Sequence, residues 1–446
     1  MDMGFLAEKN PWWKGKEHFD EDADYRSWSG NPVRWVPGIV ERIEFLPFSL
    51  HIILGPRQSG KTTATKLMIR KLLEKTGDPR AVFYFRCDVI KDYKELLELL
   101  EMYLNYRDDL GIKTSYLFLD EITMPEEWFR AVKELIDSGK LKNDVLVLTG
   151  SMSMKLRKEI ELFPGRRGHG KDFAHLTLSF REFVMVMNPE LHAKIPALKG
   201  FRGMRKASMA CVPYAAELNR MFELYLKTGG FPPALISWKR NGYVDDGTRQ
   251  AYLSWIRNDL HKAGKEESIA KEVLRALLAK MPGRISWEGI SREISVKSPK
   301  TVNSYLHAFS EMFLAHISYF IDPDTGLSQF GKNKKISFID PLTYEVVEEW
   351  CLAGLKDREP TLVEGIVASH ISRFTGEVHY WANGTEVDSV ARENGGLVGF
   401  EVKWREKAEA KRLVVGRMKE VFVLSKKTFD AEKGVVPVSV FLAMLE

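Results

Sequence analysis

A glycine-rich loop between an apolar run and a helix-forming run carries the clearest chemical signal in the sequence. It fits the phosphate-loop pattern G-x-x-x-x-G-K-[ST] in full. In such a loop the glycines let backbone N–H groups face a phosphate, and the following helix adds the positive end of its dipole. We therefore expect a nucleotide site made of Gly55, Pro56, Arg57, Gln58, Ser59, Gly60, Lys61, Thr62 and Thr63.

Two side chains of this loop and two carboxylates downstream predict hydrolysis. The Lys61 ammonium would bridge the β- and γ-phosphates, and the Thr62 hydroxyl would ligate Mg²⁺. A second apolar run ends in two carboxylates. Asp120 would hold Mg²⁺ through water, and Glu121 would orient and polarise the attacking water. An acidic pair after a strand also suits a plain helix N-terminus, but after a complete phosphate loop it indicates a hydrolytic site.

The next apolar run, residues 144–151, ends in small hydroxyl residues. Ser151 is placed where a polar side chain could sense the γ-phosphate. It also suits the N-cap of a following helix, and the two roles can coexist.

A second chemical group lies toward the C-terminus. Glu364, Asp388, Glu401 and Lys403 match the E…D…E-x-K pattern of restriction-type and junction-resolving nucleases. Glu401 and Lys403 share one side of a strand, and a neighbouring strand can bring Asp388 alongside. Glu364, Asp388 and Glu401 would hold a hard cation while Lys403 positions a water, with Glu386 as an additional ligand. The alternative is a nuclease-like fold without activity, kept for docking or nucleic-acid binding.

These residues need an α/β scaffold. Between residues 50 and 185, short β-rich runs alternate with helical stretches, which predicts parallel βα units. The aromatic residues 1–49 show no sustained period and are expected to wrap this region as loops. The predicted strands are His51–Leu54, Ala81–Arg86, Ser115–Leu119, Val145–Thr149 and His175–Phe180.

Six short motifs follow one another along the chain: Gly55–Thr62, Leu119–Glu121, Leu148–Ser151, Gly165–Arg166, Leu178–Phe183 and Tyr225–Pro232. In this order they resemble archaeal and bacterial AAA+-type ATPases that carry a winged helix and a C-terminal nuclease-like domain of the PD-(D/E)XK type. The resemblance covers nearly the whole chain. It implies a P-loop AAA+ parallel sheet of order 5-1-4-3-2, a helical lid, a winged helix and a C-terminal α/β restriction-endonuclease-like domain.

Arg166 and Pro232 are two further candidates for contact with the nucleotide. Arg166 lies in a glycine-rich turn at the rim of the nucleotide-binding domain. In ring-forming ATPases such an arginine reaches the γ-phosphate of the neighbouring subunit, and Arg167 is the second choice. A solvated basic turn is the alternative. The segment around Pro232 resembles the Gly-x-Pro lid motif, in which the proline packs on the nucleotide.

Five segments follow from these patterns: residues 1–49 (aromatic wrap), 50–190 (ATPase core), 191–265 (basic insert and helical lid), 266–345 (winged helix) and 346–446 (nuclease-like domain). The winged-helix pattern has helices over residues 269–280, 287–294 and 300–312 and a hairpin over 315–321 and 335–339. In one interpretation its DNA-facing residues are Lys297, Lys300, Asn303, His307, Lys332, Lys334 and Lys335. Winged helices also serve as protein contacts or spacers.

The basic insert contains Lys194, Lys199, Arg202, Arg205 and Lys206, with no acidic residue from 191 to 216. It suits either a phosphate backbone or a solvated loop.

Length and composition agree with a globular chain. Its 446 residues predict two to four domains, and its net charge of +5 leaves nucleic-acid binding to local patches. The three cysteines are scattered, which argues against a disulfide framework. No apolar run reaches the roughly 18 residues that span a bilayer, and no signal-peptide core is present. We expect a cytoplasmic protein without membrane contact.

Together these patterns predict a Mg²⁺-dependent ATPase with ATP and Mg²⁺ as cofactors. It would work on DNA as a homo-oligomeric ring or partial ring, for example a hexamer, and its tail would cleave branched or structured DNA. The alternative is a nucleotide-controlled switch that binds protein partners. In that case the winged helix and an inactive nuclease-like tail are docking modules.

Overall fold

The computed structural model describes residues 2–151, 163, 165–410 and 413–446. The chain divides into two compact units, Met1–Leu176 (unit 1) and Thr177–Glu446 (unit 2). Within the described ranges, no helix combines the length and the apolar composition that crossing a membrane requires.

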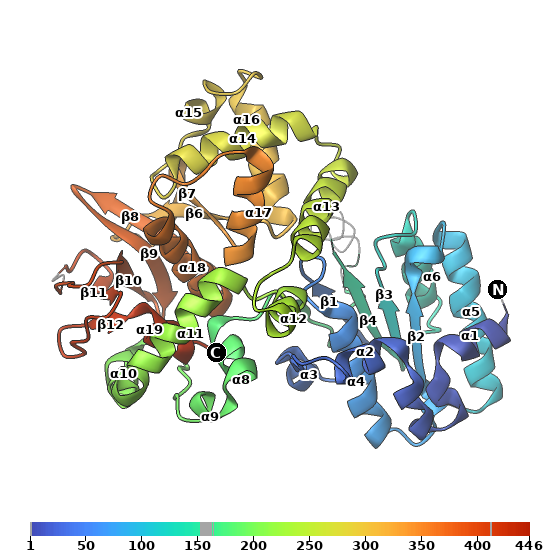
Figure 1. Ribbon diagram of the computed structural model, residues 1–446. Helices are drawn as coiled ribbons and strands as arrows, with labels where there is room; N and C mark the ends of the chain where they lie inside the picture. The colour runs from blue at the N-terminus through green and yellow to red at the C-terminus, as the bar shows by residue number, and fades with distance from the viewer. Residues whose placement is uncertain (1, 152–162, 164, 411–412) are drawn as a thin grey trace. The chain divides into compact units, whose positions relative to one another are not determined.

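A five-stranded parallel sheet forms the centre of unit 1 (Figure 1). Its strands are β1 Ser49–Leu54, β2 Val82–Arg86, β3 Tyr116–Asp120, β4 Val145–Gly150 and β5 Asp172–Ala174. The spatial order β2-β3-β4-β1-β5 confirms the expected order 5-1-4-3-2. All residues of β1 and β4 are buried, which is why these central strands are apolar throughout instead of alternating.

The prediction of the last strand was wrong. It was placed at His175–Phe180, whereas β5 is Asp172–Ala174 and pairs with the end of β1. Helix α8 (Phe180–Met187) begins where the strand was expected to end, because Ser179 and Glu182 form a reciprocal capping box. Most of β5 is exposed at the sheet edge, so it lacks the apolar run by which the other strands are recognised.

Helices follow the strands of unit 1 in the expected alternation. They are α4 Lys61–Lys75, α5 Tyr93–Asp109 and α6 Trp128–Asp137. The helix predicted after Ser151 falls outside the described residues.

The N-terminal segment is helical, not loop-like as predicted. It contains α1 Met3–Lys9, the 3₁₀ helices η1 Pro11–Lys14 and η2 Lys16–Glu21, and the helices α2 Ala23–Ser29 and α3 Ile39–Arg42. These helices are too short and too aromatic to give a 3.6-residue period.

The same segment covers the edge strand β2. The indole N–H groups of Trp12 and Trp13 both donate to the Val82 carbonyl, at 2.8 and 2.9 Å. The buried Asn10 amide accepts from the Tyr84 N–H at 2.7 Å and donates to the Tyr84 carbonyl at 3.1 Å. An open sheet edge would otherwise expose these backbone groups.

Unit 2 is built on a seven-stranded mixed sheet of order β12-β11-β10-β9-β8-β6-β7. Its strands are β6 Ala315–Ile321, β7 Ser328–Phe338, β8 His379–Asn383, β9 Thr385–Glu393, β10 Gly396–Lys403, β11 Met418–Ser425 and β12 Val435–Pro437. The β-rich runs Glu377–Ala382, Val387–Arg392 and Leu397–Trp404 predict strands, and β8, β9 and β10 lie close to them. The sequence also predicts a helix after the third run, but none is seen in the part of residues 404–417 that the structure describes.

Three helices and a hairpin occur in the order predicted for the winged helix. They are α14 Glu267–Lys280, α15 Trp287–Ser291, α16 Pro299–Glu311 and the antiparallel pair β6–β7. The hairpin is longer than predicted, and β6 also pairs in parallel with β8. The predicted wing is therefore part of the large sheet, which places β7 residues in the same layer as the C-terminal acidic residues.

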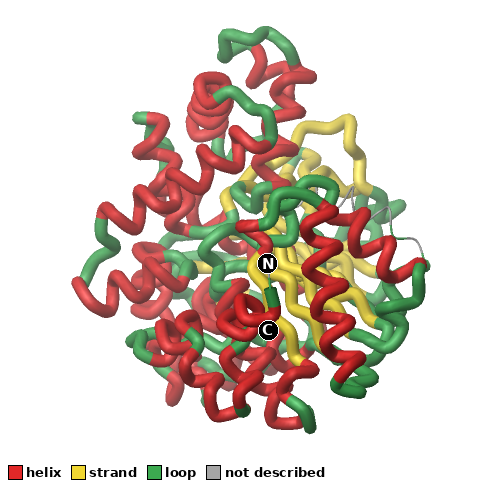
Figure 2. Tube along the Cα trace, turned by 90° about the vertical axis from the view of Figure 1, so that its right-hand side faces the viewer, coloured by secondary structure: helices red, strands yellow, loops and turns green. Residues whose placement is uncertain are grey.

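Helices make up most of the rest of unit 2 and are drawn red in Figure 2. Besides α8 they are α9 Pro189–His192, η5 Phe201–Gly203, α10 Met204–Ala210, η6 Val212–Tyr214, α11 Ala215–Thr228, α12 Pro232–Asn241, α13 Asp246–Lys262, α17 Pro341–Cys351, α18 Arg358–Thr375 and α19 Val438–Met444. The basic insert is thus mostly short helices.

Replacing Asn10 tests how strongly the N-terminal segment stabilises unit 1. The Asn10→Ala variant leaves the backbone N–H and C=O of Tyr84 buried without the side chain that now pairs with them. We expect a loss of about 2–6 kcal/mol in the free energy of unfolding, at about 1–3 kcal/mol for each of the two unsatisfied groups. Urea denaturation followed by tryptophan fluorescence measures it, with the exposed Lys16→Ala as control. Equal midpoints for the two variants would contradict this packing.

Candidate functional site

The glycine-rich loop joins the buried strand β1 to helix α4, as its spacing predicts. Gly55 has no room for a side chain, because a Cβ there would lie 1.9 Å from the His175 carbonyl oxygen. Gly60 caps α4 with φ of 93°, a left-handed conformation that favours glycine. Both glycines are therefore dictated by the backbone path that opens the loop toward a phosphate.

The ammonium of Lys61 lies across this loop. It donates to the Gly55 carbonyl at 3.0 Å and to the Pro56 carbonyl at 2.8 Å, and its side chain is buried. The ammonium is thus held against the loop itself, and its role toward the β- and γ-phosphates stays a prediction.

The carboxylate of Asp120 joins the loop to the neighbouring strands. It is 1% exposed, and its Oδ2 accepts from the Thr62 hydroxyl at 2.6 Å and from the Tyr84 hydroxyl at 3.2 Å. Its Oδ1 accepts from the Thr149 hydroxyl and from the Glu121 N–H, the latter at 3.1 Å. Thr62 and Asp120, the two predicted ligands of Mg²⁺, are therefore adjacent, and a hydroxyl with a carboxylate is a donor set that suits this hard cation.

Glu121 is held in a strained conformation beside Asp120. Its φ of 53° lies in the left-handed region, which costs a non-glycine residue about 1–3 kcal/mol. Its N–H donates to the Thr149 hydroxyl at 3.2 Å, and its Oε2 accepts from the Ser151 hydroxyl at 3.2 Å. The end of β4 thus fixes both the backbone and the carboxylate of Glu121.

Tyr84 was missed from the sequence, whereas Thr149 was included only as one of the small hydroxyl residues at the end of residues 144–151. Period two puts the Thr149 and Ser151 hydroxyls on one side of the chain where β4 ends, so this signal was available. Tyr84 gave no such signal in the sequence, because it is a single hydroxyl in an otherwise apolar strand. Burial, together with the Asp120 carboxylate, raises the pKa of Tyr84 well above its usual value, so its hydroxyl stays protonated and donates.

A buried lysine extends this network to the N-terminal segment. Lys66 of α4 is 2% exposed and lies 2.8 Å from the Asp22 carboxylate. Its ammonium is also 3.2 Å from the centre of the Tyr84 ring. Burial lowers the pKa of Lys66, and the Asp22 carboxylate opposes this shift. The contacts run from Asp22 through Lys66 and Tyr84 to Asp120.

His175 supports the loop from the other side. Its ring stacks on Trp35 with centroids 5.3 Å apart, and its Nε2 lies 2.9 Å from the Ser59 carbonyl oxygen. Burial lowers the pKa of His175 to about 3, and the nearby Lys61 ammonium adds to the shift. The neutral ring therefore donates Nε2–H to the loop.

Arg166 forms an ion pair within its own unit. Its Nε lies 2.5 Å from Asp137 Oδ1, and a second nitrogen lies 3.2 Å from Oδ2. Arg167 pairs with Asp172 at 2.6 Å. The action of Arg166 on a neighbouring subunit stays a prediction.

Pro232 is the first residue of α12 in unit 2. The preceding Gly230 N–H donates to the buried Asp340 carboxylate at 2.8 Å, and the Gly230 carbonyl accepts from the Leu178 N–H at 2.8 Å. This motif therefore has a structural function, and the role of Pro232 toward a nucleotide stays a prediction.

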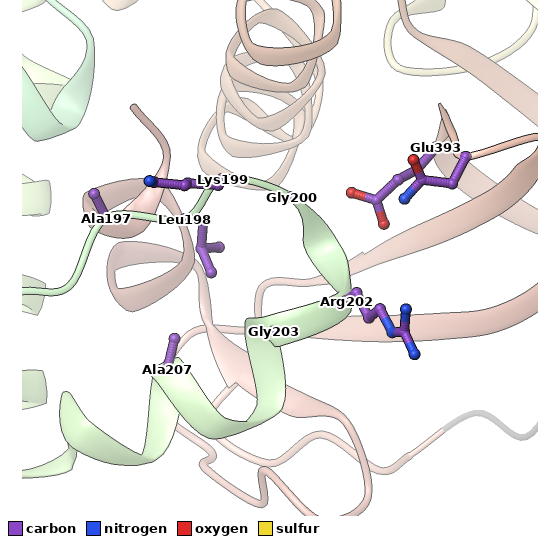
Figure 3. A pocket seen from close by; sticks show the side chains of 9 residues that line it. Ala197, Leu198, Lys199, Gly200, Arg202, Gly203, Ala207 and Glu393 are labelled. Atoms are coloured by element: carbon purple, nitrogen blue, oxygen red, sulfur yellow. The ribbon is translucent and has the colours of Figure 1, made fainter.

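The basic insert lines an open pocket with β9 (Figure 3). The Glu393 carboxylate accepts from the Phe201 N–H at 2.6 Å and fixes the insert to the sheet. Lys199 and Arg202 point away from one another in Figure 3, and Arg205 is paired with Glu420 at 2.6 Å. These cations do not converge on one phosphate.

The predicted nuclease residues come from three elements. Glu364 lies on α18, Asp388 on β9, and Glu401 and Lys403 on β10. Glu401 pairs with Lys403 at 2.5 Å, and Asp388 Oδ2 accepts from the Val402 N–H at 2.9 Å. Among the described residues, no group of three or more His, Cys, Asp or Glu side chains is arranged to hold a metal ion.

Lys335 of β7, predicted to face DNA from the wing, lies in this group instead. Its ammonium is 2.5 Å from Glu364, 2.8 Å from Glu386 and 3.1 Å from Asp388. Its neighbour Lys334 is also buried, with its ammonium 4.8 Å from the centre of the Trp287 ring. The prediction that these two lysines face DNA was wrong, because the hairpin belongs to the large sheet.

Burial and charge oppose one another in this cluster. Burial lowers the pKa of the Lys335 ammonium. The three surrounding carboxylates together raise this pKa by more than burial lowers it, so the net pKa lies well above its usual value. Burial and the Asp388 carboxylate raise the pKa of Glu364 to about 8, although Lys335 opposes them.

Comparison with known proteins assigns part of the chain. Residues 47–184 match the family model described as AAA domain. A curated relative, the uncharacterized protein MJ1544 of Methanocaldococcus jannaschii, is 26% identical over 282 residues, covering 61% of this chain and 57% of the relative. The chain therefore spans little more than half the length of that relative.

Solved structures give weaker likenesses. The Orc1 protein of Aeropyrum pernix in complex with DNA has a TM-score of 0.32 at 13% identity, over 76% of this chain and 96% of that chain. Cdc6p of Pyrobaculum aerophilum has a TM-score of 0.23 at 13% identity, over 79% and 97%. PCH-2 of C. elegans has a TM-score of 0.23 at 16% identity, over 36% and 42%.

The buried His175 predicts an acid sensitivity of unit 1. Its folded pKa of about 3 lies below the ordinary 6.5, so the unfolded chain binds an extra proton between these values. Stability is therefore fully present above pH 6.5 and falls below it, by up to about 1.4 kcal/mol per pH unit for this group. His175→Gln keeps an N–H donor without titrating and should unfold with a shallower pH dependence.

Urea denaturation of the full-length protein between pH 7.5 and 4.5 measures how the free energy of unfolding depends on pH in wild type and in His175→Gln. The exposed His169→Gln serves as control and should follow the wild type. The same slope in wild type and His175→Gln would show that His175 is not the group that titrates.

Proposed function

We propose that this chain is a Mg²⁺-dependent ATPase, and that it acts on DNA as an oligomer. The observation that carries the proposal is the junction at Asp120. There the Thr62 hydroxyl donates to Asp120 at 2.6 Å, and the next residue, Glu121, is held by the Ser151 hydroxyl at 3.2 Å. The match of residues 47–184 to an AAA domain supports nucleotide hydrolysis as the general activity.

Each side chain has a distinct task in this proposal. The backbone of residues 55–60 and the Lys61 ammonium would bind the phosphates. The Thr62 hydroxyl would hold Mg²⁺ directly, and Asp120 would hold it through water. When bound, Mg²⁺ supplies positive charge that stabilises the negative charge of the phosphates. Glu121 accepts a hydrogen bond from the attacking water and orients it, while Thr149 and Ser151 hold Glu121 in place.

Action on DNA is supported by the outer face of α16 in unit 2. Lys297, just before this helix, and Lys300 and His307 on it are exposed, and Asn303 is half-buried. A cationic helix face preceded by an N-capping serine suits a groove or a phosphate backbone. Lys332 adds an exposed cation on β7.

Substitutions in the loop and at Glu121 test the hydrolytic site. Lys61→Ala removes the phosphate-binding ammonium and should abolish both nucleotide binding and turnover. Glu121→Gln keeps the shape but not the base, so we expect at least a hundredfold loss of turnover with nucleotide binding retained. Phosphate release and nucleotide binding are measured with and without forked DNA, which should raise wild-type turnover severalfold.

The exposed Lys75→Ala, at the other end of α4, should behave as wild type. Turnover that is unchanged by DNA would count against action on DNA. Near-zero turnover with tight nucleotide retention would instead favour a switch that binds protein partners.

Mixing two inactive variants tests whether Arg166 acts on a neighbouring subunit. Arg166→Ala has an intact phosphate loop, and Lys61→Ala has an intact arginine. If the arginine reaches across the subunit interface, mixed oligomers should regain about a quarter or more of wild-type turnover. Asp137→Asn, which frees Arg166 from its ion pair, should stay active. A mixture as inactive as either variant alone would exclude action between subunits.

A further inference from the structure

We propose that the Lys335 ammonium takes the place of a divalent cation among Glu364, Glu386 and Asp388. Helix α18 and the sheet of unit 2 then form a closed acidic cluster, defined by these four residues, and not the centre of a metal-dependent nuclease. The cluster belongs to unit 2 alone, so the inference is independent of the nucleotide site.

The hydrogen-bonding capacity of the ammonium matches its surroundings. A lysine ammonium carries three N–H donors and no acceptor. Three carboxylates lie at 2.5, 2.8 and 3.1 Å from it, which gives one acceptor for each donor. A hard divalent cation would need oxygens at about 2.0–2.6 Å in the same space. The Lys335 ammonium therefore supplies the positive charge that the three carboxylates need.

Burial makes this pairing strong. The Lys335 side chain is 9% exposed, and those of Asp388 and Glu364 are 13% and 16% exposed. Buried carboxylates without a counter-ion are costly, and removing one member of a buried pair destabilises a fold strongly. The fourth member, Glu386, is more exposed and has Arg284 at 3.7 Å. The buried part of the cluster therefore has Lys335 as its cation, and the more exposed part has Arg284 as a second one.

Close packing explains how the lysine reaches the carboxylates. Helix α18 approaches β7 at Gly365, where a Cβ would lie 2.0 Å from the Tyr344 hydroxyl and 3.0 Å from the Ser337 Cβ. The preceding residue on α18 is Glu364, which this approach brings to Lys335. The cavity beside the cluster measures about 20 Å³, which is the room of about one water molecule.

The remaining predicted residues are also engaged. The second oxygen of Asp388 accepts from the Val402 N–H at 2.9 Å, and Glu401 pairs with Lys403 at 2.5 Å. Two lysines from different strands therefore serve the carboxylates that the sequence pattern assigns to a metal.

The experiment uses the full-length, nucleotide-free protein and Mn²⁺ as the probe. Binding is followed by the electron paramagnetic resonance of free Mn²⁺, and thermal unfolding is recorded with Mn²⁺ or EDTA. Lys335→Met removes the charge while keeping the length of the side chain. We expect this variant to gain one Mn²⁺ site at least tenfold tighter than any binding by the wild type. Mn²⁺ should raise its unfolding temperature and leave that of the wild type unchanged.

Two matched variants make the result specific. Lys334→Met loses the same charge one residue away, where the ammonium faces Trp287, and should gain no Mn²⁺ site. Adding Asp388→Asn to Lys335→Met should abolish the gained site. A folded Lys335→Met variant that gains no Mn²⁺ site would overturn the proposal.

The wild-type measurement decides the matter even if Lys335→Met fails to fold. Mn²⁺ binding by the wild type that disappears in Asp388→Asn would overturn the proposal. So would nicking of linear, forked or four-way DNA that depends on Asp388 and Mn²⁺. Absence of both in folded wild type supports it.

Discussion

The buried carboxylate of Asp120 is the interaction on which unit 1 depends. A carboxylate that is 1% exposed must be compensated, and here its two oxygens accept from three hydroxyls and one backbone N–H. Those donors come from α4, β2, β4 and the residue after β3. The requirement to satisfy one charge therefore fixes the relative positions of the phosphate loop and three neighbouring strands. The strain at Glu121 persists because this surrounding network over-determines it.

The N-terminal segment belongs to this network although it is far from the loop in sequence. Asn10, Trp12 and Trp13 bind the edge strand β2, and β2 carries Tyr84 to Asp120. Lys66 ties Asp22 to the face of the same tyrosine. A change in the N-terminal helices would thus be transmitted to Asp120 through Tyr84, by packing and without a direct contact.

The sequence predicts those parts of the fold in which local pattern and tertiary role agree. The position of Lys61, Thr62 and Asp120 follows from apolar strands that end in polar residues. The order of the core sheet follows only from the resemblance of the motifs to a known family. Prediction fails where the partner is distant in sequence. Tyr84 is one hydroxyl in an apolar strand, and β5 is a short polar edge strand stabilised by β1. Neither has a period of its own, so only the assembled sheet identifies them.

The acidic cluster of unit 2 shows the same limit in a more consequential form. Glu364, Asp388, Glu401 and Lys403 fill every position of a nuclease pattern, yet a pattern specifies only which residues are present. Carboxylates gathered where α18 packs on the sheet need a cation, and either a metal ion or an ammonium satisfies that need. The choice lies with Lys335, which comes from a strand before α17 and α18 and reaches the carboxylates because β6 pairs with β8. An identical set of acidic residues can therefore form a catalytic centre or a structural one, depending on a residue outside the pattern.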